Sequence, residues 1–355
     1  MNRTDRLREL MARKGLDAVI VSSEINQRYL SRYPFTDGLL LITLNNAELL
    51  TDFRYYEDAE KKADPAYAVV TPERRFPHIR QFFSDNGVRT VGFENQTLSC
   101  AELDRFKSEL SGFAFSGIGN AIEKLREVKD EGELADIARA QDTADAAFAH
   151  LLRVIKPDMT EIEVALELEF FMRRAGAEGV SFETIAVSGS ASSLPHGKPR
   201  NIKLQKGFLT LDFGALFNGY CSDMTRTVSI GAADAEMKKL YNTVLKAQTE
   251  ALAYVKEGAD CREADRIARE IIDAESEYKG TFGHSLGHGV GMFIHESPRL
   301  SAFSDATLVA GNVVTVEPGI YLKGKYGCRI EDMVAVTKDG VRNFAHSPKE
   351  LIELF

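Results

Sequence analysis

The sequence has few cysteines, no long apolar run and no excess of basic residues, and each shortage excludes a class of protein. Its cysteines lie far apart and form no CxxC pair, which argues against a disulfide framework and against a thiolate zinc site. They are Cys100, Cys221, Cys261 and Cys328. We therefore expect reduced thiols, and packing is the favoured role of Cys221 and Cys328, which lie near acidic residues in the sequence.

Membrane and nucleic-acid partners are also disfavoured. No segment approaches the roughly 20 consecutive apolar residues that a membrane-spanning helix needs. The opening segment MNRTDRLRELMARKG is charged throughout and lacks the apolar centre of a secretion signal, so we expect a cytoplasmic protein. Acidic residues outnumber basic ones by 53 to 44, for a net charge of -9. Such a chain has no electrostatic footprint for nucleic acid or for an anionic membrane.

The composition and the order of patterns predict two globular domains. The chain is 44% hydrophobic and its 355 residues exceed one average domain of about 100–200 residues. In residues 1–118, helical stretches alternate with short Val- and Ile-rich runs, which predicts an α/β domain. Gly117 and Gly119 interrupt this pattern. Residues 119–355 begin with a long helical stretch, continue with strands and two more helical stretches, and predict an α+β domain.

Two strand-like runs in the second domain carry a pair of aspartates. The segment is LTLDFGALFNGYCSDMTRTVSI, and its Asn218-Gly219 dipeptide is typical of a two-residue hairpin turn. Such a turn places Asp212 opposite Thr225, with Asp223 as the diagonal neighbour on the same face, roughly 7–8 Å away. Two metal ions could bridge that span. The alternative, solvated surface aspartates, is weakened because aspartate is disfavoured in strands and these flanks are apolar.

A second segment, GHSLGHGVGMFIHE, concentrates histidine and glycine. It contains His284, His288 and His295, three of the 7 histidines in the chain. The glycine density argues against a helix and predicts a loop folded around a ligand. A single histidine is more often a structural residue, but three in one short segment favour a functional site.

A third segment, NVVTVEPGIYLKGKYGCRIEDMVAVT, carries two glutamates with apolar flanks. An antiparallel pairing that turns around Gly324 would set Glu317 opposite Glu331. One histidine and four carboxylates form an oxygen-rich set, which suits Mn²⁺, Co²⁺ or Fe²⁺ better than a closed thiolate zinc site. Two divalent ions would neutralise the carboxylates and ionise a bridging water, and the resulting hydroxide would be the nucleophile.

These segments resemble the pita-bread metallopeptidases, the family of prolidase, aminopeptidase P and methionine aminopeptidase. The motifs DFGALFNGYCSDMTRT, HSLGHGVG, VEPGIY and RIEDM are similar to the metal-ligand segments of that family, in its order. The resemblance implies a creatinase/prolidase-type α/β domain over residues 1–118 and a pita-bread catalytic domain over residues 119–355. The likeness is strongest to compact prokaryotic prolidases.

The resemblance also implies a role for individual residues. Asp212 would bind one metal ion, Asp223 and Glu331 would bridge both ions, and His288 with Glu317 would bind the other. Glu317 would also relay protons. The residues that the resemblance places near the substrate are His196, His284, His295 and Arg299. Of these, His196 and His295 would protonate the leaving nitrogen, and Arg299 would hold the C-terminal carboxylate of a dipeptide.

The implied activity is hydrolysis of the Xaa-Pro bond of dipeptides by a metal-bridging hydroxide. The implied cofactors are two divalent ions, Mn²⁺ foremost, with Co²⁺, Fe²⁺ or Zn²⁺ as alternatives. The implied partners are short proline-containing peptides and a second copy of the chain in a homodimer. Aminopeptidase P, which acts on longer peptides, remains an alternative, and a metal-free peptide- or protein-binding module is a remote one. Methionine aminopeptidase is disfavoured because its usual forms lack a large N-terminal domain.

Overall fold

The computed structural model describes residues 2–355, and the chain divides into two compact units at Arg126 and Glu127. The break that the sequence suggests near residue 118 is a turn ahead of helix α6 (Ala121–Glu127), and the division falls at the end of that helix. The physical reason is that α6 is tied to the first unit. The carbonyl oxygen of Leu125, for example, accepts a hydrogen bond of 2.9 Å from the Tyr29 hydroxyl.

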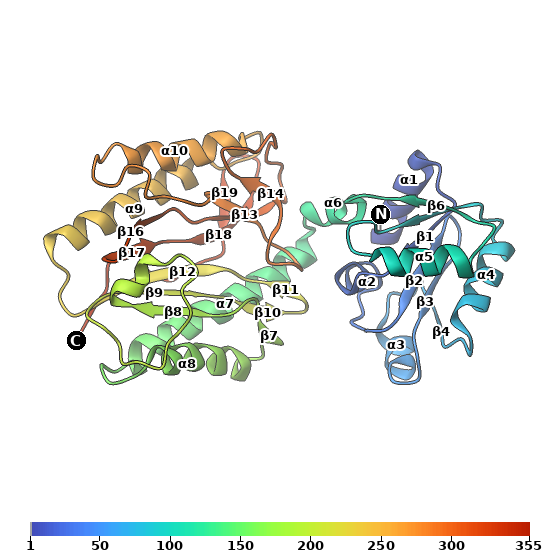
Figure 1. Ribbon diagram of the computed structural model, residues 1–355, viewed down its shortest axis with the longest axis horizontal. Coiled ribbons are helices and arrows are strands. Elements are labelled where there is room, and N and C mark those ends of the chain that lie inside the picture. The colour runs from blue at the N-terminus through green and yellow to red at the C-terminus, as the bar shows by residue number, and fades with distance from the viewer. Residues whose placement is uncertain (1) are drawn as a thin grey trace. The chain divides into compact units, whose positions relative to one another are not determined.

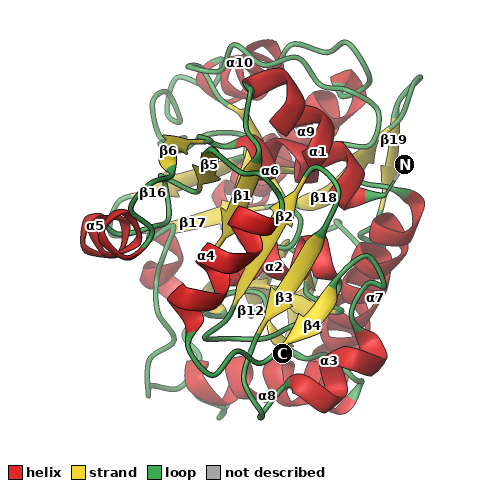
Figure 2. Ribbon diagram, turned by 90° about the vertical axis from the view of Figure 1, so that its right-hand side faces the viewer, coloured by secondary structure: helices red, strands yellow, loops and turns green. Residues whose placement is uncertain are grey.

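The first unit is an α/β domain, as predicted, with one mixed six-stranded sheet in the order β4-β3-β2-β1-β5-β6. Figure 2 shows neighbouring strands of this sheet side by side. The strands are β1 (Ala18–Val21), β2 (Leu39–Thr43), β3 (Ala47–Leu50), β4 (Ala68–Val70), β5 (Thr90–Phe93) and β6 (Ala114–Gly117). The helices before α6 are α1 (Arg3–Lys14), α2 (Glu24–Ser31), α3 (Tyr56–Lys62), α4 (Arg75–Asp85) and α5 (Cys100–Glu109). The apolar runs of β1 and β2 are buried along their whole length, as their composition predicts.

The second unit encloses several small sheets between two pairs of helices. Helices α7 (Glu131–Val154) and α8 (Glu161–Arg174) lie on one side of the strands, and α9 (Ala235–Tyr254) and α10 (Cys261–Asp273) lie on the other (Figure 1). The last two are the pair of helical stretches expected from the sequence. A capping box of Asp130 and Glu133 starts the long helix α7.

Two sheets dominate this unit. A four-stranded sheet has the order β20-β12-β9-β8, and a five-stranded sheet has the order β14-β13-β15-β18-β19. The first contains β8 (Ile185–Ser188), β9 (Gly207–Phe213), β12 (Met224–Ile230) and β20 (Glu353–Leu354). The second contains β13 (Gly287–Gly289), β14 (Glu296–Leu300), β15 (Val313–Val316), β18 (Asp332–Val336) and β19 (Val341–Asn343). Smaller pairings involve β7 (Gly179–Val180), β10 (Ala215–Phe217), β11 (Tyr220–Cys221), β16 (Gly319–Leu322) and β17 (Tyr326–Arg329).

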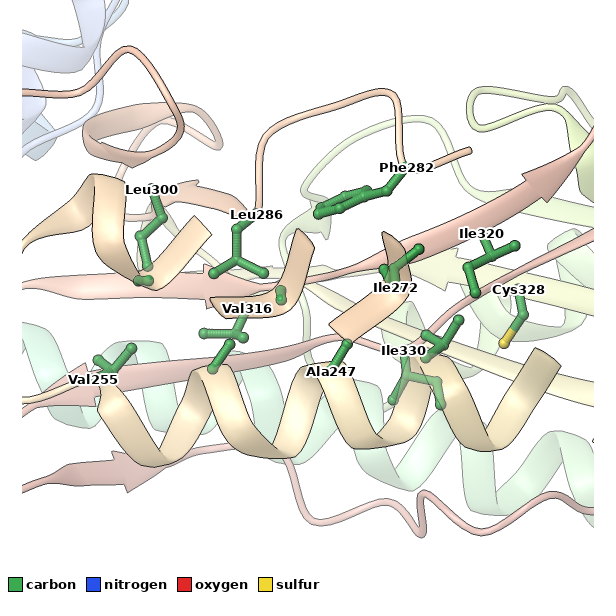
Figure 3. Close-up of a cluster of buried hydrophobic side chains, with 14 of the residues drawn as sticks. Ala247, Val255, Ile272, Phe282, Leu286, Leu300, Val316, Ile320, Cys328 and Ile330 are labelled. Atoms are coloured by element: carbon green, nitrogen blue, oxygen red, sulfur yellow. The ribbon is translucent and has the colours of Figure 1, made fainter. Parts of the chain in front are cut away.

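An apolar core joins α9 and α10 to the strands beneath them. Figure 3 shows side chains of the two helices directed towards strand residues such as Val316 and Ile320. The labelled members of this cluster are Ala247, Val255, Ile272, Phe282, Leu286, Leu300, Val316, Ile320, Cys328 and Ile330. All of them are buried, so the helices fix the strands that carry the histidine and glutamate segments.

Both predicted hairpins form with the predicted register. Asn218 and Gly219 have φ angles of 47° and 81°, which a two-residue primed turn requires. Asp212 pairs with Thr225 across β9 and β12. In the other hairpin, β15 pairs with β18 and β16 with β17 in one continuous register, which leaves Glu317 opposite Glu331.

The histidine and glycine segment differs from the predicted loop, because its centre is the short inner strand β13. Here the glycines serve close packing between strands. A Cβ atom on Gly287 would lie 2.0 Å from the carbonyl oxygen of Thr315, and one on Gly289 would lie 2.3 Å from that of Ser297. Only glycine fits at these two positions, and the strand brings His288 into the interior.

This packing predicts that Gly287→Ala is destabilising. The added methyl group meets backbone that cannot move aside easily, so we expect a loss of about 1–3 kcal/mol in the free energy of unfolding. Gly283→Ala is the matched control, because no described atom outside its own chain neighbours lies within 4 Å of the added Cβ. Equal denaturant midpoints for the two variants would contradict this explanation of the glycines.

Candidate metal centre and active-site pocket

A pocket of about 960 Å³ opens in the second unit, and it brings together all the site residues predicted from the sequence. The predicted residues that line it are His196, Asp212, Asp223, His284, His288, His295, Arg299, Glu317 and Glu331. They come from segments that are far apart in the chain, so the convergence is a property of the fold.

The pocket contains a cluster of possible metal ligands. Candidate ligand atoms of Asp223, His288 and Glu331 all lie within 4.8 Å of one another, and all three residues are buried. The Nε2 atom of His288 lies 3.5 Å from Asp223 Oδ2 and 3.4 Å from Glu317 Oε1. Glu317 is half-buried and completes the group on the side of His288.

Asp212 faces this cluster with one unsatisfied oxygen. Its Oδ2 atom accepts a hydrogen bond of 2.6 Å from Arg329 Nη2. Its Oδ1 atom is buried and has no hydrogen-bond partner within residues 2–355. A buried carboxylate oxygen without a partner is costly, and a metal ion is one group that would satisfy it.

His288 is held in a form that suits metal binding. Its Nδ1 atom lies 3.1 Å from the carbonyl oxygen of Gly289, to which it donates, and this leaves the lone pair of Nε2 facing the carboxylates. Burial lowers the pKa of His288 to about 4, so the ring is neutral at pH 7. The donor set therefore fits a divalent cation on two independent observations, the His288 tautomer and the unsatisfied oxygen of Asp212.

Burial, together with mutual repulsion, raises the pKa values of the carboxylates. Burial, followed by repulsion from Asp212 and Glu317, raises the pKa of Asp223 well above its usual value. Burial and repulsion from Asp223 likewise raise the pKa of Glu331 well above its usual value. The pKa of Glu317 is raised to about 8, mainly by burial. Without cations, these groups would hold protons at neutral pH, and bound divalent ions would return them to the ionised form.

The remaining histidines and Arg299 form the walls of the pocket. His284 Nε2 lies 2.9 Å from the Tyr321 hydroxyl, and burial lowers the pKa of His284 to about 4. The ring of His295 packs edge-on against His288, with 4.5 Å between centroids. Arg299 pairs with His288 across β14 and β13, so its side chain starts directly beside the cluster. His196 lies in the loop after the short helix η1 (Gly189–Ser193).

Sequence reasoning missed Arg329, which the structure places at the centre of the polar network. Its side chain is 4% exposed. Besides Asp212, it donates to the Tyr321 hydroxyl at 2.7 Å and to Thr225 Oγ1 at 3.1 Å. The available signal was a charged residue within an apolar strand, in CRIEDM, the same signal that drew attention to Asp212.

Two buried threonines orient the glutamates, and they were also missed. Thr225 Oγ1 donates to Glu331 Oε2 at 2.6 Å. Thr315 Oγ1 lies 3.1 Å from Glu317 Oε1 and also accepts a hydrogen bond of 3.1 Å from the backbone N–H of His288. Contacts of this kind fix the orientation of metal-binding side chains.

Comparison with known proteins assigns the chain to a family. Residues 135–338 match Metallopeptidase family M24, and residues 3–128 match the Creatinase/Prolidase N-terminal domain. The chain belongs to metallopeptidase family M24. The resemblance drawn from the motifs is thereby confirmed, as is the expected fold of an N-terminal creatinase/prolidase-type domain followed by a pita-bread domain.

Solved structures of the family cover this M24 metallopeptidase along its whole length. It is similar to a Xaa-Pro dipeptidase from Bacillus anthracis, with 41% identity over 99% of each chain and a TM-score of 0.95. It is also similar to an X-Pro aminopeptidase from Thermotoga maritima, with 37% identity over 100% of each chain and a TM-score of 0.92. A curated Xaa-Pro dipeptidase of Pyrococcus horikoshii is 35% identical over 97% of each chain.

None of the helices within residues 2–355 is both long and apolar enough to cross a membrane.

The raised pKa of Glu317 predicts how the metal-free enzyme responds to pH. In the unfolded chain this group titrates near 4.5, and in the folded protein at about 8. The folded state therefore holds a proton that the unfolded state releases, and the contribution of Glu317 to stability should fall as pH rises towards 8. In EDTA-stripped protein, we expect a lower Tm at pH 8 than at pH 7, a range in which His284 and His288 are largely neutral in both the folded and the unfolded chain, and a larger rise on adding Mn²⁺ at pH 8.

Glu317→Gln provides the control, because it removes one titrating group while preserving the shape of the side chain. The pH dependence of Tm in the stripped variant should be shallower than in the stripped wild type. A stripped wild type whose Tm is the same at both pH values would show that the carboxylates are not coupled in this way.

Proposed function

We propose that this protein is a two-metal Xaa-Pro dipeptidase, which hydrolyses the bond between a first residue and a C-terminal proline. One observation carries the proposal: Arg299, whose guanidinium group could bind a carboxylate, lies across the strand pair from His288, in a pocket that also contains a cluster of candidate metal ligands. The Xaa-Pro dipeptidases among the relatives support it. The match of residues 3–128 to a creatinase/prolidase domain disfavours methionine aminopeptidase.

We assign Asp212 to one metal ion, His288 and Glu317 to the other, and Asp223 and Glu331 to a bridging position. The unsatisfied oxygen of Asp212 and the buried positions of Asp223 and Glu331 support this assignment. Two divalent ions bound there would polarise the scissile carbonyl and activate water. The same donor set disfavours a metal-free binding module.

The chain's own residues would handle the protons. Glu317 Oε1 is engaged by Thr315, so its other oxygen is the one we expect to take a proton from the attacking water. The proline nitrogen is a tertiary amide nitrogen and must be protonated as it leaves. His295, packed against His288, and His196 are the proposed donors, because both line the pocket.

Arg299 would set the length of the substrate. Its guanidinium group can bind a carboxylate with two parallel hydrogen bonds. Only a substrate that ends one residue after the cleaved bond presents its C-terminal carboxylate beside the metal centre. A dipeptide therefore gains an interaction that a longer peptide lacks.

Xaa-Pro aminopeptidase activity is the second candidate. The pocket, at about 960 Å³, is near the upper end of the roughly 300–1,000 Å³ that is common for small-molecule sites, and this leaves room for a longer peptide. A relative with that activity in its name is 37% identical to this chain. The two candidates share the metal centre and differ in the role of Arg299.

Three finer assignments belong to the same proposal. Mn²⁺ is the proposed ion, because oxygen-rich donor sets suit it. A homodimer is proposed from the family resemblance. A cytoplasmic location is proposed from the cysteines, all of which are free thiols, as in a reducing compartment.

Arg299→Ala tests the proposed substrate length. For a Xaa-Pro dipeptide we expect kcat/KM to fall by the equivalent of about 1.5–3 kcal/mol, the scale of a hydrogen bond to a charged group. For a tripeptide with the same first two residues, the loss should be much smaller. Steady-state rates with both peptides at saturating Mn²⁺ provide the measurement.

His295→Ala is the companion variant, since a proton donor serves both substrates. It should keep its metal and lose about 10²–10⁴-fold in rate with dipeptide and tripeptide alike. If Arg299→Ala also loses equally with both peptides, Arg299 does not bind the carboxylate of the dipeptide, and Xaa-Pro aminopeptidase becomes the better description.

A further inference from the structure

The proposed bridging carboxylates come from two different sheets. Asp223 immediately precedes β12 of the four-stranded sheet, and Glu331 immediately precedes β18 of the five-stranded sheet. At the seam between these sheets, the backbone N–H of Glu331 donates to the carbonyl oxygen of Thr225 at 3.1 Å. The distance between Asp223 and Glu331 therefore depends on whatever holds β12 and β18 together.

Arg226 joins β12 to the start of β18 on the face that points away from the pocket. Successive side chains of a strand point to opposite faces, so Arg226 lies on the reverse face from Thr225, whose hydroxyl meets Glu331. The Arg226 side chain is 1% exposed. Its Nη1 atom donates to the carbonyl oxygens of Glu331 at 2.5 Å and Thr225 at 3.0 Å, which joins the two strands directly.

Asp332 completes the junction from the other sheet. It pairs with Arg226 Nη2 at 2.8 Å through Oδ1, and its side chain is 0% exposed. Its Oδ2 atom accepts hydrogen bonds from Gln248 of α9 at 3.1 Å, Asn343 of β19 at 2.9 Å and Lys349 at 2.7 Å. The pair is thus anchored by three separate parts of the chain.

We propose that Arg226 and Asp332 are positioning residues, which set the spacing between Asp223 and Glu331 for binding of the metal ions. A buried ion pair is often no more stabilising than apolar residues of the same volume. Here, however, the pair spans two sheets at the level of the two bridging ligands. Neither residue lines the pocket, so they act on the site only through the strands. This inference rests on the proposed metal centre.

The test is titration of Mn²⁺ into the EDTA-stripped full-length protein. We expect wild type to bind two ions and Arg226→Met to bind them about 10–100-fold more weakly, as is common when residues that orient metal ligands are removed. Arg226→Lys keeps the positive charge but lacks the forked guanidinium group, so it should give an intermediate affinity for Mn²⁺. Ile272→Ala, a buried α10 position, is the control for general destabilisation, and its metal affinity should stay within about two-fold of wild type.

A kinetic measurement separates positioning from a merely structural role. At saturating Mn²⁺, Arg226→Met should lower kcat for a Xaa-Pro dipeptide and leave KM within about two-fold of wild type, because Arg226 does not contact the pocket. Wild-type metal affinity in Arg226→Met would overturn the inference. If that variant does not fold, Asp332→Asn provides the test, and wild-type affinity there would overturn it equally. Failure of the wild type to bind metal would instead refute the proposed function.

Discussion

Repulsion among the carboxylates of one pocket is the interaction on which the rest of the catalytic unit depends. Asp212, Asp223, Glu317 and Glu331 are brought together with little solvent to screen them, and burial raises the pKa of three of them. A fold that holds such a group must either keep it protonated or supply positive charge. Arg329 supplies part of that charge by binding Asp212, and divalent cations in the proposed metal centre would supply the remainder.

The second unit holds these acidic side chains in place with rigid secondary structure and buried hydrogen bonds. Two hairpins present the carboxylates in pairs, the inner strand β13 carries His288, and two threonines fix the glutamates. The helices α9 and α10 cover the strands with a continuous apolar core. Asp212 and His288 lie on strands and the other three residues lie directly beside strand ends, so all five are held more precisely than residues on long loops, which suits the proposed metal centre.

Local patterns in the sequence were sufficient for much of this site. Asn218-Gly219 fixes a hairpin register, so the relation of Asp212 to Asp223 follows from the order of residues in that segment. The position of Gly324 likewise fixes the register of the second hairpin, which sets Glu317 opposite Glu331. These predictions succeeded because a tight turn and a two-residue repeat determine which side chains share a face.

The sequence was less informative where contacts join distant segments. The glycines around His288 are typical of a loop, yet in the structure they allow β13 to pack closely against the backbone of its neighbours. Cβ atoms at Gly287 and Gly289 would lie only 2.0 and 2.3 Å from carbonyl oxygens of neighbouring strands. Arg329 and Arg226 were not singled out, because their partners lie on other strands and no local pattern links them. The sequence indicated a break near Gly119. It did not indicate that α6 belongs to the first unit, because that attachment depends on contacts with a helix far away in the chain.

Anomalous X-ray diffraction from crystals of the protein with Mn²⁺ would test the two-metal centre most directly. We predict two peaks about 3.5–4 Å apart. Both should lie next to Asp223 and Glu331, with Asp212 beside one peak and His288 beside the other. A single peak, or peaks away from these residues, would contradict the account.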